Sequence, residues 1–242
     1  MLKLSTRLTN IASLVNRGDN VADIGTDHGL LPIYLVSNNI SNKVIAMDIN
    51  KGPLLSANKN IEENNLTDKI ETRLSNGFEK LNIGEVDCAV IAGMGGSLVA
   101  NIIRENINIA KSLKYLIVSP QSEIDKFRET MRDLGFKVID EKIVFDSEKY
   151  YFIMKYQIGL EEELSLKEKH FGRILLKKKD KTLLEYLQNE KRIYLGILKQ
   201  LENQMKKNNS DVYNDVYNRN EKRLVEVRGY LTLLDETIDE LL

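Results

Sequence analysis

The chain's most informative spacing of chemical groups lies in residues 21–29, which read VADIGTDHG. A short apolar run leads into a turn that holds two carboxylates, Asp23 and Asp27, and a helix pattern follows at once. In an open α/β sheet, such a turn forms a small-molecule pocket at the carboxyl end of the first strand. A negatively charged turn repels a pyrophosphate and attracts an ammonium or sulfonium group. The segment therefore predicts a site for S-adenosylmethionine rather than for a dinucleotide.

Two further strand ends carry polar groups that suit an adenosine. Asp48 ends a second apolar run, and a carboxylate there can accept hydrogen bonds from both ribose hydroxyls, although many such residues only cap a turn. Asn76 follows a third run and can bind an adenine edge, while Gly77 permits close backbone approach. An Asn-Gly turn without a ligand is the alternative. The order of these strand ends along the chain favours the ligand interpretation.

A fourth apolar run ends in a glycine-rich turn, Ala92-Gly93-Met94-Gly95-Gly96. Three glycines within four residues indicate that the backbone passes close to a ligand or to a packed helix. Methyltransferases that act on exocyclic amines usually carry Asp/Asn-Pro-Pro-aromatic at this place, and that string is absent here. A ring nitrogen already has an in-plane lone pair and needs positioning more than deprotonation. The turn therefore favours a ring-nitrogen acceptor.

The elements that must position these residues alternate along the first part of the chain. Strands are predicted at 20–24, 43–48, 70–75, 87–92, 115–119, 136–144 and 150–157, with helices at 53–64, 98–110 and 123–134. Strands separated by helices imply a mostly parallel sheet. Only residues 145–149 join the last two strands, which permits an antiparallel hairpin but no crossover. The expected class is α/β, with the Rossmann-like fold of a class I methyltransferase.

Beyond residue 158 the sequence predicts a helical coiled-coil hairpin. Apolar residues recur at heptad spacing along two stretches, and the polar run 206–211 suits a turn between them. The two seams are Leu183, Leu187, Tyr194, Leu198, Leu201 and Met205, then Leu224, Val227, Leu231, Leu234, Ile238 and Leu241. We therefore expect two domains, a catalytic domain over 1–158 that binds S-adenosylmethionine and an antiparallel helical hairpin over 159–242.

Composition argues against several classes of protein. With a single cysteine, Cys88, and two histidines, no disulfide can form within the chain, and we expect no metal site. No apolar stretch reaches the length of a transmembrane helix, and the first residues do not read as a signal peptide, so we expect a cytoplasmic protein without a membrane partner. The net charge of −1 offers no general attraction to nucleic acid, and no obligate protein partner is evident.

Positive charge is nevertheless concentrated in residues 167–181, where seven basic residues face two acidic ones. A solvated helix face is the ordinary interpretation of such a run. Beside a core that modifies nucleic acid, the same run would contact backbone phosphates. Its basic members are Lys167, Lys169, Arg173, Lys177, Lys178, Lys179 and Lys181.

Five strings occur in order along the chain: LSTRL at 4–8, DIGTDHGLLP at 23–32, DINKGPL at 48–54, AGMGG at 92–96 and SPQ at 119–121. Together they closely resemble the bacterial tRNA (adenine-N1)-methyltransferase family that acts on adenine 22 of tRNA. The resemblance implies an enzyme that transfers a methyl group from S-adenosylmethionine to N1 of that adenine, with the helical hairpin helping to hold tRNA. The residues alone also allow methylation of another RNA or a small amine, or a nucleotide-binding module without turnover.

The resemblance also implies roles for individual residues. The cofactor-binding set would be Asp23, Gly25, Asp27, His28, Gly29, Asp48, Ile49, Asn76, Gly77, Ala92 and Gly93. The catalytic set, between the sulfonium and the acceptor base, would be Arg7, Asp27, His28, Gly93 and Met94. Two of these have plain structural alternatives, because His28 can cap the following helix and Arg7 can pair with a nearby carboxylate.

Overall fold

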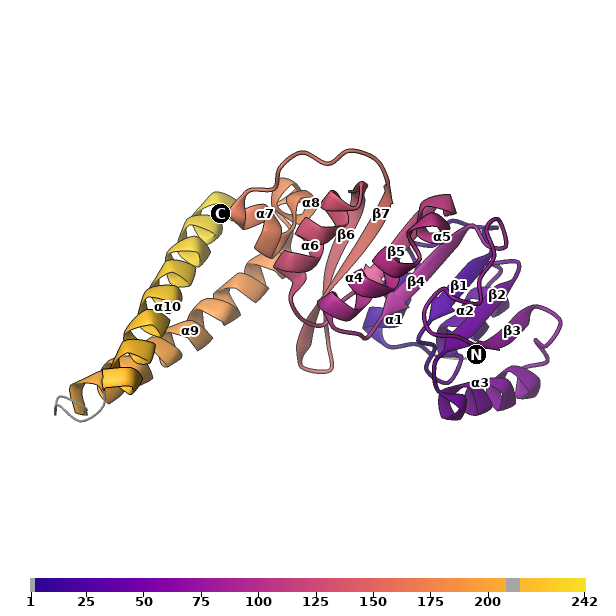
Figure 1. Ribbon diagram of the computed structural model, residues 1–242, viewed down its shortest axis with the longest axis horizontal. Coiled ribbons are helices and arrows are strands. Elements are labelled where there is room, and N and C mark those ends of the chain that lie inside the picture. Colours follow the sequence, from indigo (N-terminus) through magenta and orange to yellow (C-terminus); the bar gives the residue numbers. More distant parts are fainter. Residues whose placement is uncertain (1–2, 208–213) are drawn as a thin grey trace. The chain divides into compact units, whose positions relative to one another are not determined.

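The computed structural model describes residues 3–207 and 214–242, and side chains outside 206–218. Seven strands form one sheet in the order β3-β2-β1-β4-β5-β7-β6 (Figure 1). They are β1 (Val21–Ile24), β2 (Val44–Asp48), β3 (Ile70–Leu74), β4 (Cys88–Ala92), β5 (Tyr115–Ser119), β6 (Phe136–Asp146) and β7 (Lys149–Ile158). Strands β1 to β5 pair in parallel, and β7 pairs antiparallel with both β5 and β6. The predicted Rossmann-like methyltransferase fold is confirmed.

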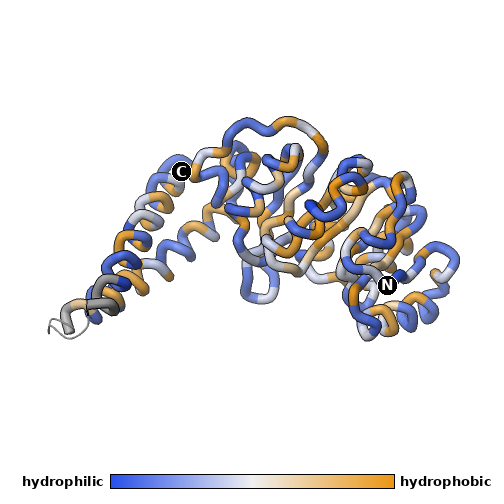
Figure 2. The backbone as a smooth tube through the Cα atoms, viewed as in Figure 1, coloured by the Kyte–Doolittle hydropathy of each residue, from blue (hydrophilic) through white to orange (hydrophobic). Residues whose placement is uncertain are grey.

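Helices cover the sheet on both faces. The first group is α1 (Thr6–Ala12), α2 (Leu30–Ser37) and α3 (Lys51–Glu63), and the second is α4 (Gly96–Glu105), α5 (Ile107–Ser112) and α6 (Ile124–Asp133). The first group packs into one hydrophobic core with alternate residues of the central strands. In the second group α4 contacts both α5 and α6 (Figure 1). Because helices lie on both faces, β1, β4 and β5 are buried at nearly every residue, and most of these residues are apolar (Figure 2).

The predicted helix over 98–110 is wrong in one respect, since two helices occupy that stretch. The break falls at Asn106, whose backbone leaves the helical region. Its side-chain amide donates to the Ile102 carbonyl at 3.2 Å, and its own carbonyl accepts from the Ala110 amide at 3.0 Å. The Asn106 side chain thus ends one helix while its backbone starts the next. Such competition between side-chain and backbone hydrogen bonds is not visible in the periodicity of apolar residues.

The boundary between compact units differs from the expected one. The chain divides into Met1–Ile174 and Leu175–Leu242, so residues 159–174 belong with the first unit. They include α7 (Leu166–Phe171), whose Lys169 carbonyl accepts from Arg128 Nη1 at 2.9 Å. Composition changes at residue 159, but packing against the sheet domain continues for one further helix. Helix α8 (Arg173–Lys178) crosses the boundary.

The second unit holds the long helices α9 (Lys181–Lys207) and α10 (Asn214–Leu241). Tyr194 and Tyr230 bring their rings within 4.6 Å, Lys191 pairs with Asp235, and Glu202 pairs with Arg228. Pairing partners therefore run in opposite directions, so the helices are antiparallel (Figure 1). The buried seam residues are Leu183, Leu187, Val227, Leu231, Leu234, Ile238 and Leu241. Most of the predicted turn at 206–211 lies outside the described residues.

Candidate active site

The predicted site residues gather at the carboxyl edge of the sheet. The chain passes outward from β1 to β3 and then returns to place β4 on the other side of β1. This reversal is the switch point at which open α/β sheets bind small molecules. Backbone hydrogen bonds fasten the turns to one another there, with Gly25 N donating to Met47 O at 2.8 Å and Ser75 N to Asp48 O at 2.9 Å.

A small cavity of about 70 Å³ opens at this edge, between β1, α1 and α2. It brings together predicted residues that lie apart in the sequence. Three aliphatic side chains complete the wall, so the cavity has an apolar side and an acidic side. The lining residues are Arg7, Leu8, Asp23, Gly25, Asp27, Leu30, Leu31 and Ala92.

Asp23 is the most strongly perturbed acid of this cavity. Its side chain lies at the end of β1 and is only 7% exposed. Burial raises the pKa of Asp23 to about 6, and the neighbouring charges of Asp27 and Asp48 add to the rise. The three carboxylates lie close enough to repel one another, and a cation bound among them would offset that repulsion.

Asp48 stands at the end of β2, as expected, and already caps its own turn. One carboxylate oxygen accepts from the Asn50 backbone amide at 2.6 Å. The neighbouring Ile49 is 61% exposed, so an apolar surface next to the carboxylate is available to a flat ring. Asn76 instead uses its amide within its own loop, donating to Glu79 Oε1 at 2.8 Å. Of the three, Asp48 and Ile49 present a carboxylate and an exposed apolar side chain at the end of β2, whereas the Asn76 amide is engaged within its own loop.

The predicted glycines divide into two groups by what they face. A Cβ on Gly25 would collide with the methyl group of Met94, so this turn and the glycine-rich turn press against each other. A Cβ on Gly93 would lie 3.8 Å from Arg7 Nη1 and 3.9 Å from Gln121 Nε2. Gly25 and Gly93 therefore face the site.

The other two glycines serve packing. A Cβ on Gly29 would lie 3.2 Å from the Cβ of Ala57, where α2 approaches α3. A Cβ on Gly77 would lie 2.7 Å from a methyl group of Ile102 on α4. Sequence spacing alone treats these glycines like Gly25 and Gly93, although their neighbours are helices.

Arg7 enters the site from α1 and is held at both ends. Its backbone amide donates to Asp146 Oδ2 at 2.9 Å, and its guanidinium lies 4.8 Å from the centre of the Tyr151 ring. The buried Nη1 atom has no hydrogen-bond partner among the described residues. Arg7 does bind a carboxylate, as the alternative interpretation expects, but through its backbone amide. Its guanidinium lies in the cavity wall, where it can contact a ligand.

His28 lies at the rim of the cavity with a left-handed backbone, φ 56°. The exposed ring places Nε2 3.4 Å from Asp27 Oδ1. The N-cap of α2 is Gly29 and no side chain caps the helix, so His28 does not have the capping role that was its alternative. Its carbonyl accepts from Asn60 Nδ2 at 2.8 Å, which fixes the turn and leaves the ring at the surface.

The basic run at 167–181 is not uniformly available to a partner. Lys169 pairs with Glu129, and Arg173 pairs with both Glu161 and Glu168. These two residues serve the fold of the first unit. Lys167 is half-buried, and the exposed members are Lys177, Lys178, Lys179 and Lys181.

Sequence reasoning missed Tyr151 and gave no role to Gln121. Tyr151 follows from register, because β7 runs antiparallel to β5 with Val118 opposite Met154. The first residues of β7 must therefore extend past the carboxyl end of β5 at Ser119. The position of Tyr151 could have been inferred from the predicted hairpin, because the second strand of the hairpin begins at the carboxyl edge of the sheet.

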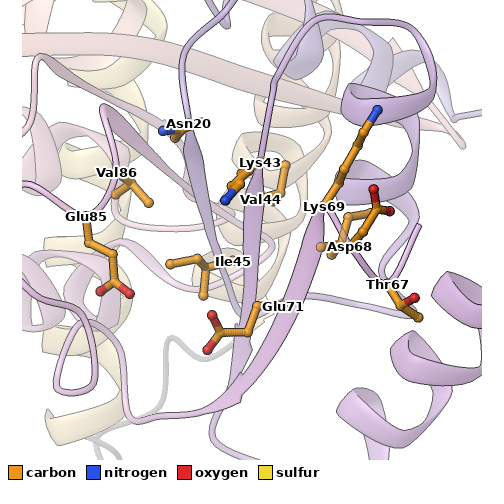
Figure 3. A pocket seen from close by; sticks show the side chains of 11 residues that line it. Asn20, Lys43, Val44, Ile45, Thr67, Asp68, Lys69, Glu71, Glu85 and Val86 are labelled. Atoms are coloured by element: carbon orange, nitrogen blue, oxygen red, sulfur yellow. The ribbon is translucent and has the colours of Figure 1, made fainter.

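A larger cavity, of about 550 Å³, lies at the opposite edge of the sheet (Figure 3). Its lining residues precede or begin the strands, as with Asn20 before β1, Lys43 before β2 and Val86 before β4. Because α/β sheets bind ligands at the carboxyl edge, the small acidic cavity is the better site despite its size. The described residues contain no group of three metal-ligating side chains, and none of their helices is long and apolar enough to cross a membrane.

Comparison with known proteins agrees with this geometry. A family model described as a methyltransferase domain matches residues 4–154. The tRNA (adenine(22)-N(1))-methyltransferase of Bacillus subtilis is 36% identical over 158 residues, which span 65% of this chain and 66% of that protein. The crystal structure of the B. subtilis m1A22 tRNA methyltransferase TrmK has 31% identity and a TM-score of 0.82, over 98% of this chain and 100% of that one. M. capricolum TrmK in complex with S-adenosyl-homocysteine has 30% identity and a TM-score of 0.74, over 96% and 99%.

The fold and the site at its switch point define a methyltransferase, and the chain belongs to the methyltransferase-domain family. Within that class it belongs to the family of tRNA (adenine(22)-N1)-methyltransferases. The resemblance seen in the five sequence strings is thereby confirmed.

Proposed function

We propose that this protein transfers a methyl group from S-adenosylmethionine to N1 of adenine 22 in tRNA, giving 1-methyladenosine. The observation that carries the proposal is the acidic cavity at the switch point, where the buried Asp23 lies under the turn of Gly25 and beside Ala92. A cavity with this charge suits a sulfonium better than it suits a phosphate.

The residues around the cavity fit the cofactor. Asp48 would accept hydrogen bonds from the ribose, Ile49 would pack on the adenine, and Asp23 and Asp27 would face the cationic end. Gly25 would bring the backbone close to the methionine portion. When bound, S-adenosylmethionine supplies a methyl carbon that N1 attacks in line, while the electron pair of the broken carbon–sulfur bond leaves with sulfur.

No proton has to leave N1 before this attack, so the protein has to position and desolvate the base. Gly93 is exposed and lies next to Arg7, and the Met94 side chain lies against Gly25, so both would line the approach of the base. Arg7 carries an unpartnered guanidinium nitrogen in the same wall, as judged among the described residues, and this nitrogen would bind the base or a phosphate. His28 and Asp27 at the rim would complete the contact with the extruded nucleotide.

The helical unit would hold the rest of the tRNA. Lys177, Lys178, Lys179 and Lys181 are exposed, and they lie next to one another in sequence. Phosphate contacts by such residues supply affinity without reading sequence. Both substrates, tRNA and S-adenosylmethionine, belong to the cytoplasm, where we place the protein.

A methyl-transfer assay tests the proposal. The purified protein is incubated with cofactor labelled in its methyl group and with tRNA transcripts that carry adenine or guanine at position 22. Label in 1-methyladenosine from the adenine transcript alone is the expected result. Label at another position, on another RNA or on a small amine would contradict the proposed acceptor. Cofactor binding without any transfer would indicate a binding module instead.

A further inference from the structure

The Ser119-Pro120-Gln121 string has no role in the account above. It forms the turn after β5, and backbone hydrogen bonds join it to the glycine-rich turn after β4. Gly93 N donates to Ser119 O at 3.3 Å, and Gln121 N donates to Met94 O at 2.9 Å. The two turns are therefore held next to each other at the carboxyl edge of the sheet.

A second cavity, of about 120 Å³, opens on this turn. Its walls are two tyrosine rings from the start of β7, the proline and glutamine of the turn, and two further side chains. The lining residues are Pro120, Gln121, Ile124, Lys149, Tyr150 and Tyr151. Pockets that bind an extruded base commonly combine aromatic rings, which stack on the base, with polar groups, which form hydrogen bonds to its edge.

The second cavity borders the acidic one. Tyr151 lines the second cavity, and the guanidinium of Arg7, which lines the acidic cavity, lies 4.8 Å from its ring centre. The Gln121 amide and Arg7 Nη1 both approach the same point over Gly93, at 3.9 and 3.8 Å from a Cβ placed there. A base in the second cavity would therefore reach the methyl donor across Gly93.

The side chain of Gln121 is exposed, and its amide makes no hydrogen bond to any residue that the structure describes. A glutamine amide pairs bidentately with adenine, because its oxygen accepts from the N6 amino group while its nitrogen donates to N7. This contact uses the Hoogsteen edge, so N1 on the Watson–Crick edge stays open. Guanine presents acceptors at both O6 and N7 and leaves the amide oxygen without a donor.

We propose that Gln121 selects the acceptor base, by binding N6 and N7 of adenine in the second cavity, beside Tyr151, and turning N1 toward the methyl donor. The inference rests on the proposed function and adds to it the residue that determines specificity for adenine.

The test compares tRNA carrying adenine with tRNA carrying 7-deazaadenine at the target position, in which a C–H group replaces N7. The quantity measured is the ratio of kcat/KM for the two tRNAs in the wild type and in Gln121→Ala. The ratio in Gln121→Ala reports the intrinsic reactivity of the two bases. Relative to it, the wild type is expected to favour adenine by roughly 2- to 13-fold, the value of the one hydrogen bond to N7 that the analogue removes. The affinity for S-adenosylmethionine should be the same in both proteins.

Gln121→Glu provides a second variant with an opposite expectation. Its carboxylate still accepts from N6 but repels the lone pair of N7, so 7-deazaadenine should become the better acceptor. Gln157→Ala, on β7 at the far edge of the sheet, is the matched control and should keep the wild-type ratio. Equal ratios in the wild type and Gln121→Ala would overturn the role of Gln121 while leaving methyl transfer to adenine in place. Absence of transfer to any adenine by the wild type would overturn both proposals.

Discussion

Asp23 is a carboxyl group buried at the end of β1, where the surroundings disfavour its ionised form. Because burial raises its pKa to about 6, it is partly protonated in mildly acidic solution. A cation bound beside it favours the ionised form, so binding then releases a proton. Affinity for S-adenosylmethionine should therefore fall as the pH drops through about 6, by up to about tenfold per pH unit. Isothermal titration across this range measures the effect, and Asp23→Asn should remove it. An unchanged pH profile in the variant would assign the dependence to another group.

The same residue should lower the stability of the free protein. Its folded pKa lies above the ordinary value of 3.8, so the stabilising contribution is present when Asp23 is protonated and is lost as the pH rises through about 6. Asp23→Asn should raise the free energy of unfolding at neutral pH by up to about 3 kcal/mol and change it little below the unfolded pKa. Urea unfolding at the two pH values measures this difference. A variant that is destabilised at neutral pH would show that Asp23 is held ionised by partners in the fold.

Asp48 offers a residue-scale test of cofactor recognition. Asp48→Ala should weaken S-adenosylmethionine binding by roughly 1.5–3 kcal/mol, since it removes hydrogen bonds to a charged acceptor. Asp68→Ala is the matched control, because Asp68 is an exposed carboxylate that lines the cavity at the opposite edge of the sheet. Titration calorimetry compares the two variants. Equal affinity in Asp48→Ala and wild type would mean that Asp48 only caps its turn.

At the scale of elements, a buried ion pair fastens α7 to the sheet domain. Arg128 and Glu141 are 3% and 1% exposed and lie 3.0 Å apart, and Glu141 also accepts from the backbone of Ile174. Gly172 passes over this pair with φ +92°, and a Cβ there would come within 2.7 Å of both Glu141 oxygens. The pair thus requires glycine at this position for space as well as for backbone conformation.

Gly172→Ala should therefore destabilise the first unit more than backbone strain alone explains. Gly84 is the matched control, because it has φ +81° but open space around it. We expect a loss of about 1 kcal/mol for Gly84→Ala and about 3 kcal/mol or more for Gly172→Ala. Urea denaturation of the two variants measures the difference. Equal losses would show that the ion pair moves aside at no cost.

The elements were predictable from sequence to different degrees, for physical reasons. The apolar runs of β1, β2, β4 and β5 indicate buried parallel strands, and the short link before β7 forces the hairpin. The site edge follows, because the polar groups stand where those strands end. The contact of Arg7 with Tyr151 and the ion pair of Arg128 with Glu141 join distant segments, so no local pattern predicts them. For the same reason the change in composition at residue 159 does not show that the first compact unit continues to Ile174.

At the scale of the whole molecule, the boundary predicts which fragments fold. A chain that ends at Ile174 keeps the first unit complete and should bind S-adenosylmethionine with the affinity of the full protein. A chain that ends at Gly159 lacks Phe171, which is fully buried, and uncovers Arg128 and Glu141. This shorter fragment should have a clearly lower Tm and poor binding, because it removes core packing and the partners of a buried charge pair. Thermal unfolding and calorimetry of the two fragments measure the difference, and equal stability would place the boundary back at residue 159.

We expect the first unit to bind S-adenosylmethionine and the second unit to contribute to tRNA binding. If the basic run binds tRNA, changing Lys177, Lys178 and Lys179 together to Gln should raise the KM for tRNA. The slope of log affinity against log salt should fall by up to about three, because each phosphate that a lysine neutralises adds nearly one to that slope. The affinity for S-adenosylmethionine should not change, because the acidic cavity lies within residues 1–174.

A matched triple change at Lys59, Lys80 and Lys111 removes the same charge from exposed positions of the first unit. If the lysines act only through the overall charge of the protein, both triple variants should lose the same tRNA affinity. If the basic run contacts phosphates directly, only the first variant should lose affinity. Filter binding at several salt concentrations separates these outcomes. Wild-type salt dependence in the first variant would make the run a solvated helix face, and the tRNA surface would then have to lie on the methyltransferase unit, around the rim formed by Arg7, His28 and Tyr151.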